Sequence, residues 1–437
     1  MKKSLLALFI LITGLSSFAQ LNSKKLDSLF ESLDENKKWM GSIAISLNGL
    51  PIYAKAIGFA DLETKKRSTT LSKYRVGSIS KTFTATLIFK AIEEKKLSLT
   101  DKLSKYFPTV KNADKITINN LLNHRSGIYN FINSPEYRNY YTTKKSTSEL
   151  VELISSYPPD FEPNTKFSYS NSNYVLLGYI LEKVYQLPLK EILSNKIIQP
   201  LLLKNTYLGD KIDLTNNEVF SYTFMGNWNK LPSTDMSIPA GAGAVVATPS
   251  DLTIFITALL NGKIVSKQSV EQMITLTDGY GFGLFPYQFK DKKGIGHNGG
   301  IDGFSSMLFY FIEDRLSIAL ISNGNTYENN KIVNSVLADY YKIPYNIPTF
   351  KSINLKSEDL DPYLGEYSAP NFPLKITITK KDTVLFTQAT GQAAFAVEAI
   401  EKDVFEFKAA GIVLEFNPSK KQMTVKQGGG KYILTKP

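Results

Sequence analysis

The pattern of apolar residues changes near residue 345, and this change constrains the fold more than any other feature. Pro344 and Pro348 are followed by a polar run over 351–361. Proline and polar clusters of this kind interrupt regular elements and mark boundaries. The chain has 437 residues, which exceeds the size at which a single hydrophobic core stops growing. We therefore predict two domains, over 20–345 and 361–437, joined by a linker over 346–360.

The C-terminal part carries short apolar runs with partial two-residue alternation. The runs recur about every ten residues, which is typical of an all-β barrel or sandwich. Lys-Lys, Gly and Asn-Pro breaks separate them. We predict a small all-β barrel with strands at 372–379, 383–387, 393–400, 404–407, 412–416, 422–425 and 432–434.

The N-terminal part combines strand and helix signals. Asn48 and Gly49 both tolerate positive φ and separate two β-rich runs, so they predict a hairpin. Strands at both ends with helices between them predict one α+β domain whose sheet joins the two ends of the domain. The predicted strands cover 41–47, 52–57, 279–285, 305–311 and 316–322, the predicted helices cover 25–35, 79–94 and 330–341, and 97–237 is expected to be mostly helix and loop.

The first residues are typical of an export signal. Lys2 and Lys3 give a positive start, an apolar run follows over 5–12, and Ser17 and Ala19 frame a cleavage site. The run is too short for a membrane span, which needs about 20 apolar residues. We expect a cleaved signal peptide over 1–19, a periplasmic or secreted mature protein, and no transmembrane segment.

Composition excludes several classes of function. Cysteine is absent and histidine occurs only as His124 and His297, so thiolate sites are impossible and a zinc-type cluster is not expected. We expect no metal and no other cofactor. The net charge is +11, but the lysines are spread in pairs instead of being gathered with aromatic residues. This spread argues against nucleic-acid binding and is typical of a solvated basic surface.

Ser78 and Lys81 form a Ser-x-x-Lys tetrad at the start of a predicted helix. Gly77 permits a close approach, and the spacing places Lys81 one turn beyond Ser78 on the same face. The helix N-terminus favours negative charge developing on oxygen. Burial of the lysine would lower its pKa toward values at which an amine acts as a base. The alternative is an ordinary serine N-cap followed by an exposed lysine.

Two later segments offer the remaining groups that such chemistry needs. Tyr169 and Asn171 precede an apolar helix; the phenol could pass a proton to a leaving group, and the amide could hold Lys81 and a substrate amide. Alternatively, Tyr169 is a core residue and Asn171 caps its helix. The run His297-Asn298-Gly299-Gly300 is expected to bind substrate, because its glycines would let a substrate lie along a strand. Its alternative is a glycine-rich turn with a surface histidine.

These motifs resemble, in their order along the chain, the three-motif set of the β-lactamase-related serine hydrolases. The resemblance covers residues 24–342 and implies a β-lactamase/transpeptidase-like fold, in which an antiparallel sheet is flanked by helices and accompanied by a helical region. The segment 363–367 resembles the lipocalin-like barrels that some members carry. The segments that carry the resemblance are 74–77, 78–81, 121–127, 169–171, 239–241, 248–252, 279–283, 297–299 and Asn323.

The resemblance implies roles for individual residues. Ser78 attacks the substrate carbonyl to form an acyl-enzyme, Lys81 acts as the base, and Tyr169 relays the proton. The N–H groups of Ser78 and Gly300 form the oxyanion hole. His124 packs a loop beneath the site; the alternative for it is a Ser-His-Asp triad.

Two departures from the family pattern bear on the substrate. Class C β-lactamases usually carry Lys-Thr-Gly where this chain has His297, and some carboxypeptidases with the histidine form have threonine where it has Gly300. Both departures favour D-amino-acid peptide or ester hydrolysis over β-lactam hydrolysis. We expect a hydrolase of D-alanyl-D-alanine carboxypeptidase, D-aminopeptidase or esterase type that acts on small or peptide substrates, such as peptidoglycan fragments. The alternatives are a catalytically weak protein that binds cell-wall peptides, or a β-lactamase.

Overall fold

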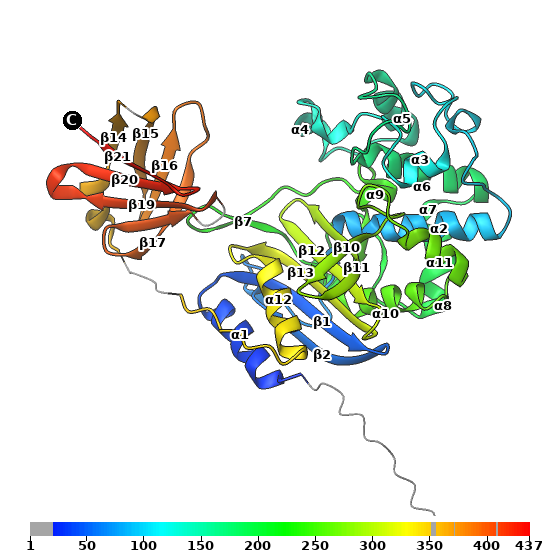
Figure 1. Ribbon diagram of the computed structural model, residues 1–437, viewed down its shortest axis with the longest axis horizontal. Coiled ribbons are helices and arrows are strands. Elements are labelled where there is room, and N and C mark those ends of the chain that lie inside the picture. The colour runs from blue at the N-terminus through cyan, green and yellow to red at the C-terminus, as the bar shows by residue number, and fades with distance from the viewer. Residues whose placement is uncertain (1–20, 351–354, 371, 408–409) are drawn as a thin grey trace, which may run out of the picture.

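The computed structural model describes residues 21–350, 355–370, 372–407 and 410–437. The predicted signal peptide lies outside these residues. Within the ranges that the structure describes, no helix combines the length and hydrophobicity that a membrane span needs. The described chain forms a six-stranded antiparallel sheet, a helical region and a closed barrel (Figure 1). The predicted α+β fold followed by a small all-β barrel is confirmed.

The sheet draws its strands from both ends of the first domain, as the strand signals predict. The hairpin at Asn48 and Gly49 is confirmed, because both residues have positive φ, at 54° and 80°. In spatial order the strands are β10 (Phe285–Phe289), β11 (Lys292–Ile301), β12 (Phe304–Phe311), β13 (Leu316–Asn325), β1 (Trp39–Leu47) and β2 (Leu50–Ile57).

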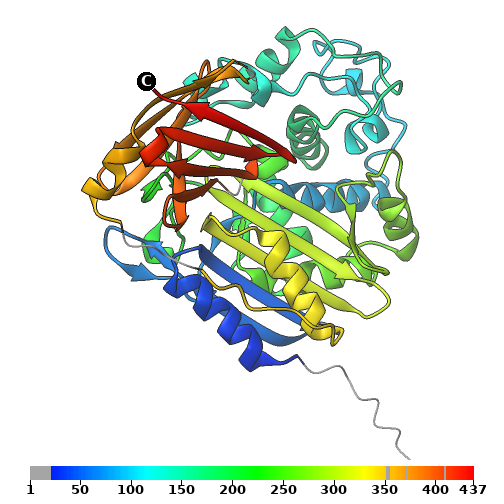
Figure 2. The ribbon, with the colours of Figure 1, turned by 60° about the vertical axis from the view of Figure 1, so that its left-hand side comes forward.

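Helices cover both faces of this sheet. On one face, α1 (Ser23–Glu35) and α12 (Asn329–Tyr340) lie side by side (Figure 2) and share an apolar cluster with β1, β12 and β13. On the other face, α10 (Pro249–Leu260) packs its apolar side against the same three strands. Strand β1 is therefore buried along almost its whole length, which explains its nearly continuous run of apolar and small residues.

The helical region lies beyond α10 and surrounds α2 (Ser80–Glu93). Helix α2 is buried on all sides, because 11 of its residues are buried. This burial fixes the position of the helix that follows Ser78. The other elements of this region are α3 (Ile118–Leu122), α4 (Tyr137–Tyr140), α5 (Thr147–Ser156), α6 (Asn171–Tyr185), α7 (Leu189–Leu193), α8 (Gln199–Leu201), α9 (Ala240–Gly243) and α11 (Lys267–Ile274).

One predicted strand is wrong. The segment 279–284 forms a loop, and the strand begins only at Phe285. Gly279 and Gly283 have positive φ, at 78° and 69°, which is incompatible with an extended strand. The turn packs against the helix of the serine motif, where the α-carbon of Gly283 lies so close to Lys81 that a Cβ would be 2.8 Å from its carbonyl oxygen. The strand that the sequence did not predict here is β11, which contains the glycine-rich run.

The barrel closes with eight antiparallel strands. Its interior is filled by side chains, among them Tyr367, Phe405 and Phe416. Leu360, which the sequence placed in the linker, is fully buried in this cluster, so the barrel's core begins before residue 361. The strands are β14 (Gly365–Ala369), β15 (Phe372–Lys381), β16 (Val384–Ala389), β17 (Phe395–Glu401), β18 (Val404–Phe407), β19 (Ile412–Asn417), β20 (Gln422–Gln427) and β21 (Gly430–Thr435).

The barrel lies beside the hairpin of β7 (Tyr222–Phe224) and β8 (Trp228–Lys230), as Figure 1 shows. The Nζ atom of Lys38 is 2.6 Å from a carboxylate oxygen of Glu398 in the barrel. At the tip of the hairpin, a Cβ on Gly226 would lie 2.6 Å from side-chain carbons of Val384. The barrel therefore contacts the first domain on the side where the hairpin emerges.

Candidate active site

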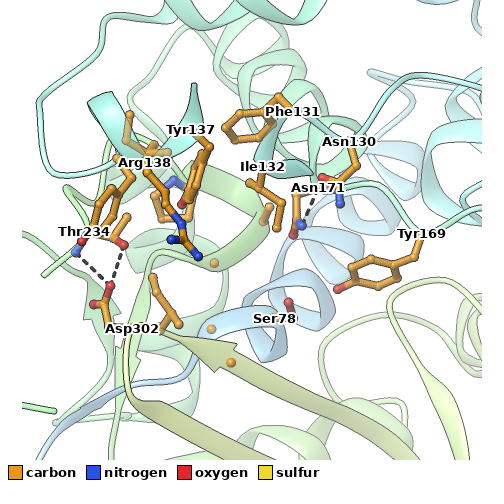
Figure 3. Close-up of a pocket in the computed structure, with 18 residues that line it drawn as sticks. Ser78, Asn130, Phe131, Ile132, Tyr137, Arg138, Tyr169, Asn171, Thr234 and Asp302 are labelled. Carbon is orange, nitrogen blue, oxygen red and sulfur yellow. Dashed lines mark hydrogen bonds between the residues drawn. The ribbon is translucent and has the colours of Figure 1, made fainter. Parts of the chain in front are cut away.

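Ser78 lies in a short 3₁₀ turn (Gly77–Ile79) that leads directly into α2. Its side chain lines a cavity of about 760 Å³ that also receives residues from α4, α6, α9 and the end of β11 (Figure 3). The serine is half-buried, so its hydroxyl is both held by protein and open to the cavity. This position matches the prediction that the serine stands at a helix start.

Lys81 is completely buried, with no exposed surface. Its Nζ atom lies 2.9 Å from Ser78 Oγ, 2.7 Å from Asn171 Oδ1 and 2.9 Å from the carbonyl oxygen of Ala242. Burial lowers the pKa of Lys81 well below its ordinary value. Among the described residues no carboxylate pairs with the amine, so no ion pair opposes this effect of desolvation.

The three contacts of Lys81 define the direction of proton transfer. A neutral amine has two N–H donors and one lone pair. The carbonyl of Ala242 only accepts hydrogen bonds, and Asn171 presents its oxygen to the lysine, because its Nδ2 atom donates to Asn130 Oδ1 at 3.3 Å. Both N–H donors are thereby used, and the lone pair faces the hydroxyl of Ser78. This is the geometry of a base that takes the serine proton.

Tyr169 and Ser78 face each other in the cavity (Figure 3). Burial raises the pKa of Tyr169 above its ordinary value, and this effect outweighs the smaller lowering effect of the nearby Ser78 side chain. Tyr169 therefore stays protonated at neutral pH. Lys81 Nζ lies 4.9 Å from the centre of its ring, so hydroxyl, amine and phenol meet at one place. The structure therefore brings the side chains of Ser78, Lys81 and Tyr169 together, as predicted.

The backbones of the serine turn and of β11 touch. A Cβ on Gly77, whose φ is +53°, would lie 2.8 Å from the nitrogen of Gly300, and one on Gly299 would lie 2.8 Å from the nitrogen of Ser78. Only glycine tolerates such approaches. The sequence predicted that glycines would permit a close contact here, and these positions require them.

Strand β11 offers an open edge next to this contact. Strand β10 pairs with β11 only over Lys292–Gly296, and the later residues have no partner on that side. Gly300 is opposite Ser305 on β12. The carbonyl of Ser305 points away from β11, because it accepts hydrogen bonds from the side chains of Ser322 and Asn329. Gly300 and Ser305 therefore form a pair that exchanges no backbone hydrogen bonds, and the N–H of Gly300 points to the open edge, where Ser78 lies.

His297 does not reach the cavity. Its side chain is buried, at 3% exposure, between Tyr280 and Phe285. One ring nitrogen faces the carbonyl oxygen of Asn298, which requires it to carry the proton, and the other lies 2.9 Å from the hydroxyl of Tyr280. Burial, together with the charge of Lys81, lowers the pKa of His297 to about 3. The prediction of a neutral histidine agrees with this, whereas its predicted contact with substrate is wrong, because both nitrogens are engaged inside the protein.

The other three residues of that run differ in position. Gly300 lines the cavity, whereas Asn298 and Gly299 do not. Asn298 is exposed to solvent. Gly299 has no side chain, and this allows β11 to approach the backbone of Ser78 closely. Of the four residues predicted to bind substrate in this run, the structure brings one into the cavity.

His124 lies beneath Tyr169, with its ring centre 4.3 Å from the tyrosine ring. It is fully buried, and its Nδ1 atom accepts the backbone N–H of Ser170 at 3.2 Å. Burial lowers the pKa of His124 well below its ordinary value. The histidine supports the loop that carries Tyr169, which agrees with the predicted structural role and leaves no place for it in a triad with Ser78.

Three contributors to the site were not predicted from the sequence. Asn130 orients the amide of Asn171, Ala242 supplies a carbonyl to Lys81, and Tyr280 holds His297. Ala242 acts through its backbone, so its side chain gives no signal. Tyr280 belongs to a glycine-rich segment that the family resemblance marks, but nothing in that segment indicates a partner for the histidine.

Comparisons with known proteins agree with this geometry. The sequence profile of the family described as Beta-lactamase matches residues 26–341. Penicillin-binding protein 4* of Bacillus subtilis (strain 168) is 26% identical over 439 residues, covering 91% of this chain and 94% of the relative. Teichoic acid D-alanine hydrolase of Staphylococcus aureus (strain MRSA252) is 27% identical over 336 residues, covering 74% and 81%.

Among solved structures, the D-amino acid amidase from Ochrobactrum anthropi SV3 in complex with D-phenylalanine has a TM-score of 0.64 and 25% identity, and it matches 73% of this chain and 99% of its own. Because the profile spans most of the chain and these relatives share its fold, the chain belongs to the beta-lactamase family and is a serine hydrolase.

Proposed function

We propose that this protein is an exported hydrolase that forms an acyl-enzyme on Ser78 and acts on peptidoglycan-type D-amino-acid peptides or on small esters and amides. The observation that carries the proposal is the set of three contacts around the buried amine of Lys81, which leaves its lone pair facing the serine. Two relatives, by their names, act on D-alanine or D-amino acid groups.

The chemistry follows from the contacts. Lys81 takes the hydroxyl proton of Ser78 as the oxygen attacks the substrate carbonyl. The resulting oxyanion accepts hydrogen bonds from the N–H groups of Ser78 and Gly300. Tyr169 donates its proton to the leaving oxygen or nitrogen and recovers one from Lys81. A water molecule then attacks the acyl-serine, and the same groups carry the proton in the reverse direction, which restores the free hydroxyl.

The buried histidine bears on the choice between substrates. His297 is neutral and has no free nitrogen to hold a substrate carboxylate, unlike a lysine ammonium. This weakens β-lactam hydrolysis more than ester or amide hydrolysis, because β-lactams carry a carboxylate close to the reacting carbonyl.

A turnover panel tests the proposal. It contains a D-alanyl-D-alanine peptide, a D-aminoacyl amide, nitrocefin and a p-nitrophenyl ester, each assayed with the mature protein and with Ser78→Ala. We expect Ser78-dependent cleavage of the ester and slow turnover of nitrocefin. A well-folded protein that cleaves none of the four would point to a binding protein instead, and fast nitrocefin turnover would show that the reasoning on His297 is wrong.

Export is part of the proposal and has its own test. When the full chain is expressed in a bacterium with a secretory pathway, the exported form should begin at Gln20. N-terminal sequencing of that form checks the expectation. Recovery of a full-length chain from the cytoplasm alone would contradict it.

A further inference from the structure

The cavity beside Ser78 carries an unbalanced positive charge. Its lining is mostly aromatic and aliphatic, with neutral polar groups near the serine, and only Arg138 and Asp302 of the lining residues carry full charges. Whether these two charges cancel decides what the cavity attracts.

Asp302 is already neutralised within the protein. Its Oδ2 atom lies 3.1 Å from Nη1 of Arg75, and the two side chains are 1% and 2% exposed. Its Oδ1 atom accepts the backbone N–H of Thr234 at 3.0 Å and the threonine hydroxyl at 2.6 Å. Both carboxylate oxygens are engaged away from solvent, so Asp302 offers no charge to a ligand.

Arg138 has no such partner. It stands on α4, is exposed, and makes neither a hydrogen bond nor an ion pair with any residue that the structure describes. Figure 3 shows its guanidinium reaching into the cavity, above the end of β11. A planar guanidinium with five N–H donors that faces a cavity is suited to grip an oxyanion with two parallel hydrogen bonds.

The position of Arg138 indicates which part of a substrate it would meet. In Figure 3, Ser78 lies between Tyr169 on one side and Arg138 on the other. In the proposed mechanism Tyr169 protonates the leaving group, so the leaving group lies on the tyrosine side. The acyl group then extends to the other side of Ser78, toward Arg138.

We propose that Arg138 determines specificity for substrates whose acyl portion carries a carboxylate, a few bonds away from the reacting carbonyl. This inference rests on the proposed function and deepens it. An acyl group that ends in a free ammonium would meet a like charge, and the one carboxylate of the cavity is already paired. The preferred substrate is therefore an N-acylated D-amino acid ester or amide with an acidic acyl extension, such as a peptide with an acidic residue.

The test compares two p-nitrophenyl esters of D-alanine that differ only in charge. One carries N-succinyl, which ends in a carboxylate, and the other carries the succinamide analogue, which ends in a neutral amide of the same shape. For the wild type we expect kcat/KM to be about tenfold higher for the anionic ester, the effect of one charged hydrogen-bonded contact in partial solvent. The preference should shrink as salt is added.

Arg138→Gln should abolish the preference, so that the anionic and the neutral ester have similar kcat/KM values. Arg138→Glu should reverse it. Lys144→Gln is the matched control, because Lys144 is exposed a few residues further along but does not line the cavity, and it should keep the preference. Since Arg138 and Lys144 are both exposed, all three variants should have the melting temperature of the wild type.

The outcomes separate the two proposals. Hydrolysis of the neutral ester reports the proposed function, and the ratio between the esters reports this inference. Equal rates in the wild type, or a preference that survives in Arg138→Gln, would overturn the role of Arg138 while leaving the serine hydrolase intact. If neither ester were cleaved, the proposed function and the inference would fall together.

Discussion

Replacing Asn171 with aspartate would place a carboxylate beside the amine that we identify as the base. Asn171 Oδ1 lies 2.7 Å from Lys81 Nζ, so the change alters charge while keeping shape. A carboxylate stabilises the ammonium form of the lysine, and it therefore raises the pKa of Lys81 from its lowered position. The neutral amine would then be present only at higher pH.

The size of the shift follows from the contact. Two unit charges 2.7 Å apart attract by about 6 kcal/mol at an effective dielectric constant of about 20, but desolvation of the new carboxylate offsets much of that attraction. A charged hydrogen bond is worth about 1.5–3 kcal/mol net. At about 1.4 kcal/mol per unit, the pKa of Lys81 should rise by roughly one to two units.

The assay is the pH dependence of kcat/KM for a neutral p-nitrophenyl ester. Activity requires unprotonated Lys81, so it rises with pH through the lysine pKa, and Asn171→Asp should move this acid limb upward by roughly one to two units. Below the limb the variant should be roughly 10- to 100-fold slower than the wild type, with most of the rate regained at high pH.

Asn171→Ala is the matched control, since it removes the oxygen without adding charge. It should lower kcat/KM at all pH values and should not move the acid limb upward. If Asn171→Asp were folded and slow yet had the wild-type acid limb, Lys81 would not be the group whose proton limits the reaction, and the reasoning from its three contacts would be refuted.

Three further predictions test other parts of the site. Tyr169→Phe should slow amide hydrolysis by roughly 10²- to 10⁴-fold but affect a p-nitrophenyl ester far less, because p-nitrophenolate leaves without a proton; equal losses in steady-state kinetics would remove the proposed relay. Gly77→Ala should lower the free energy of unfolding more than Gly391→Ala does, because both glycines have positive φ but a Cβ at 391 meets open space; chemical denaturation compares them, and equal costs would contradict the close contact. Arg75→Met should lower the free energy of unfolding by roughly 3–5 kcal/mol, because it leaves Asp302 buried and unpaired. The double variant Arg75→Met/Asp302→Leu should recover part of this loss. A single variant as stable as the wild type would show that the ion pair contributes little to stability.

Much of the fold can be predicted because its signals are local. The hairpin at Asn48 and Gly49 depends on two residues that tolerate positive φ, and α1 and α12 depend on helical spacing of apolar residues. The barrel strands are predicted from regular short runs, although β14 was missed because its five residues contain only one buried apolar side chain. The segment 279–284 was mistaken for a strand because its aromatic residues suggest one, whereas its positive-φ glycines require a turn.

The site could be predicted in part. Ser78, Lys81 and Tyr169 are marked by the order and spacing of their motifs, and they converge as expected. The orientation of His297 could not be predicted, because the side of a strand that faces a cavity depends on pairing between strands distant in sequence. The same holds for the carbonyl of Ala242, whose contact with Lys81 is a backbone contact between segments 161 residues apart.

The most direct test of the account is the identity of the residue that acts as the nucleophile. The mature protein should be treated with a fluorophosphonate, digested, and analysed by mass spectrometry to locate the adduct. The account predicts one adduct, on Ser78, which is absent from Ser78→Ala and forms much more slowly in Lys81→Met. An adduct on another residue, or labelling of folded Ser78→Ala at the wild-type rate, would contradict it.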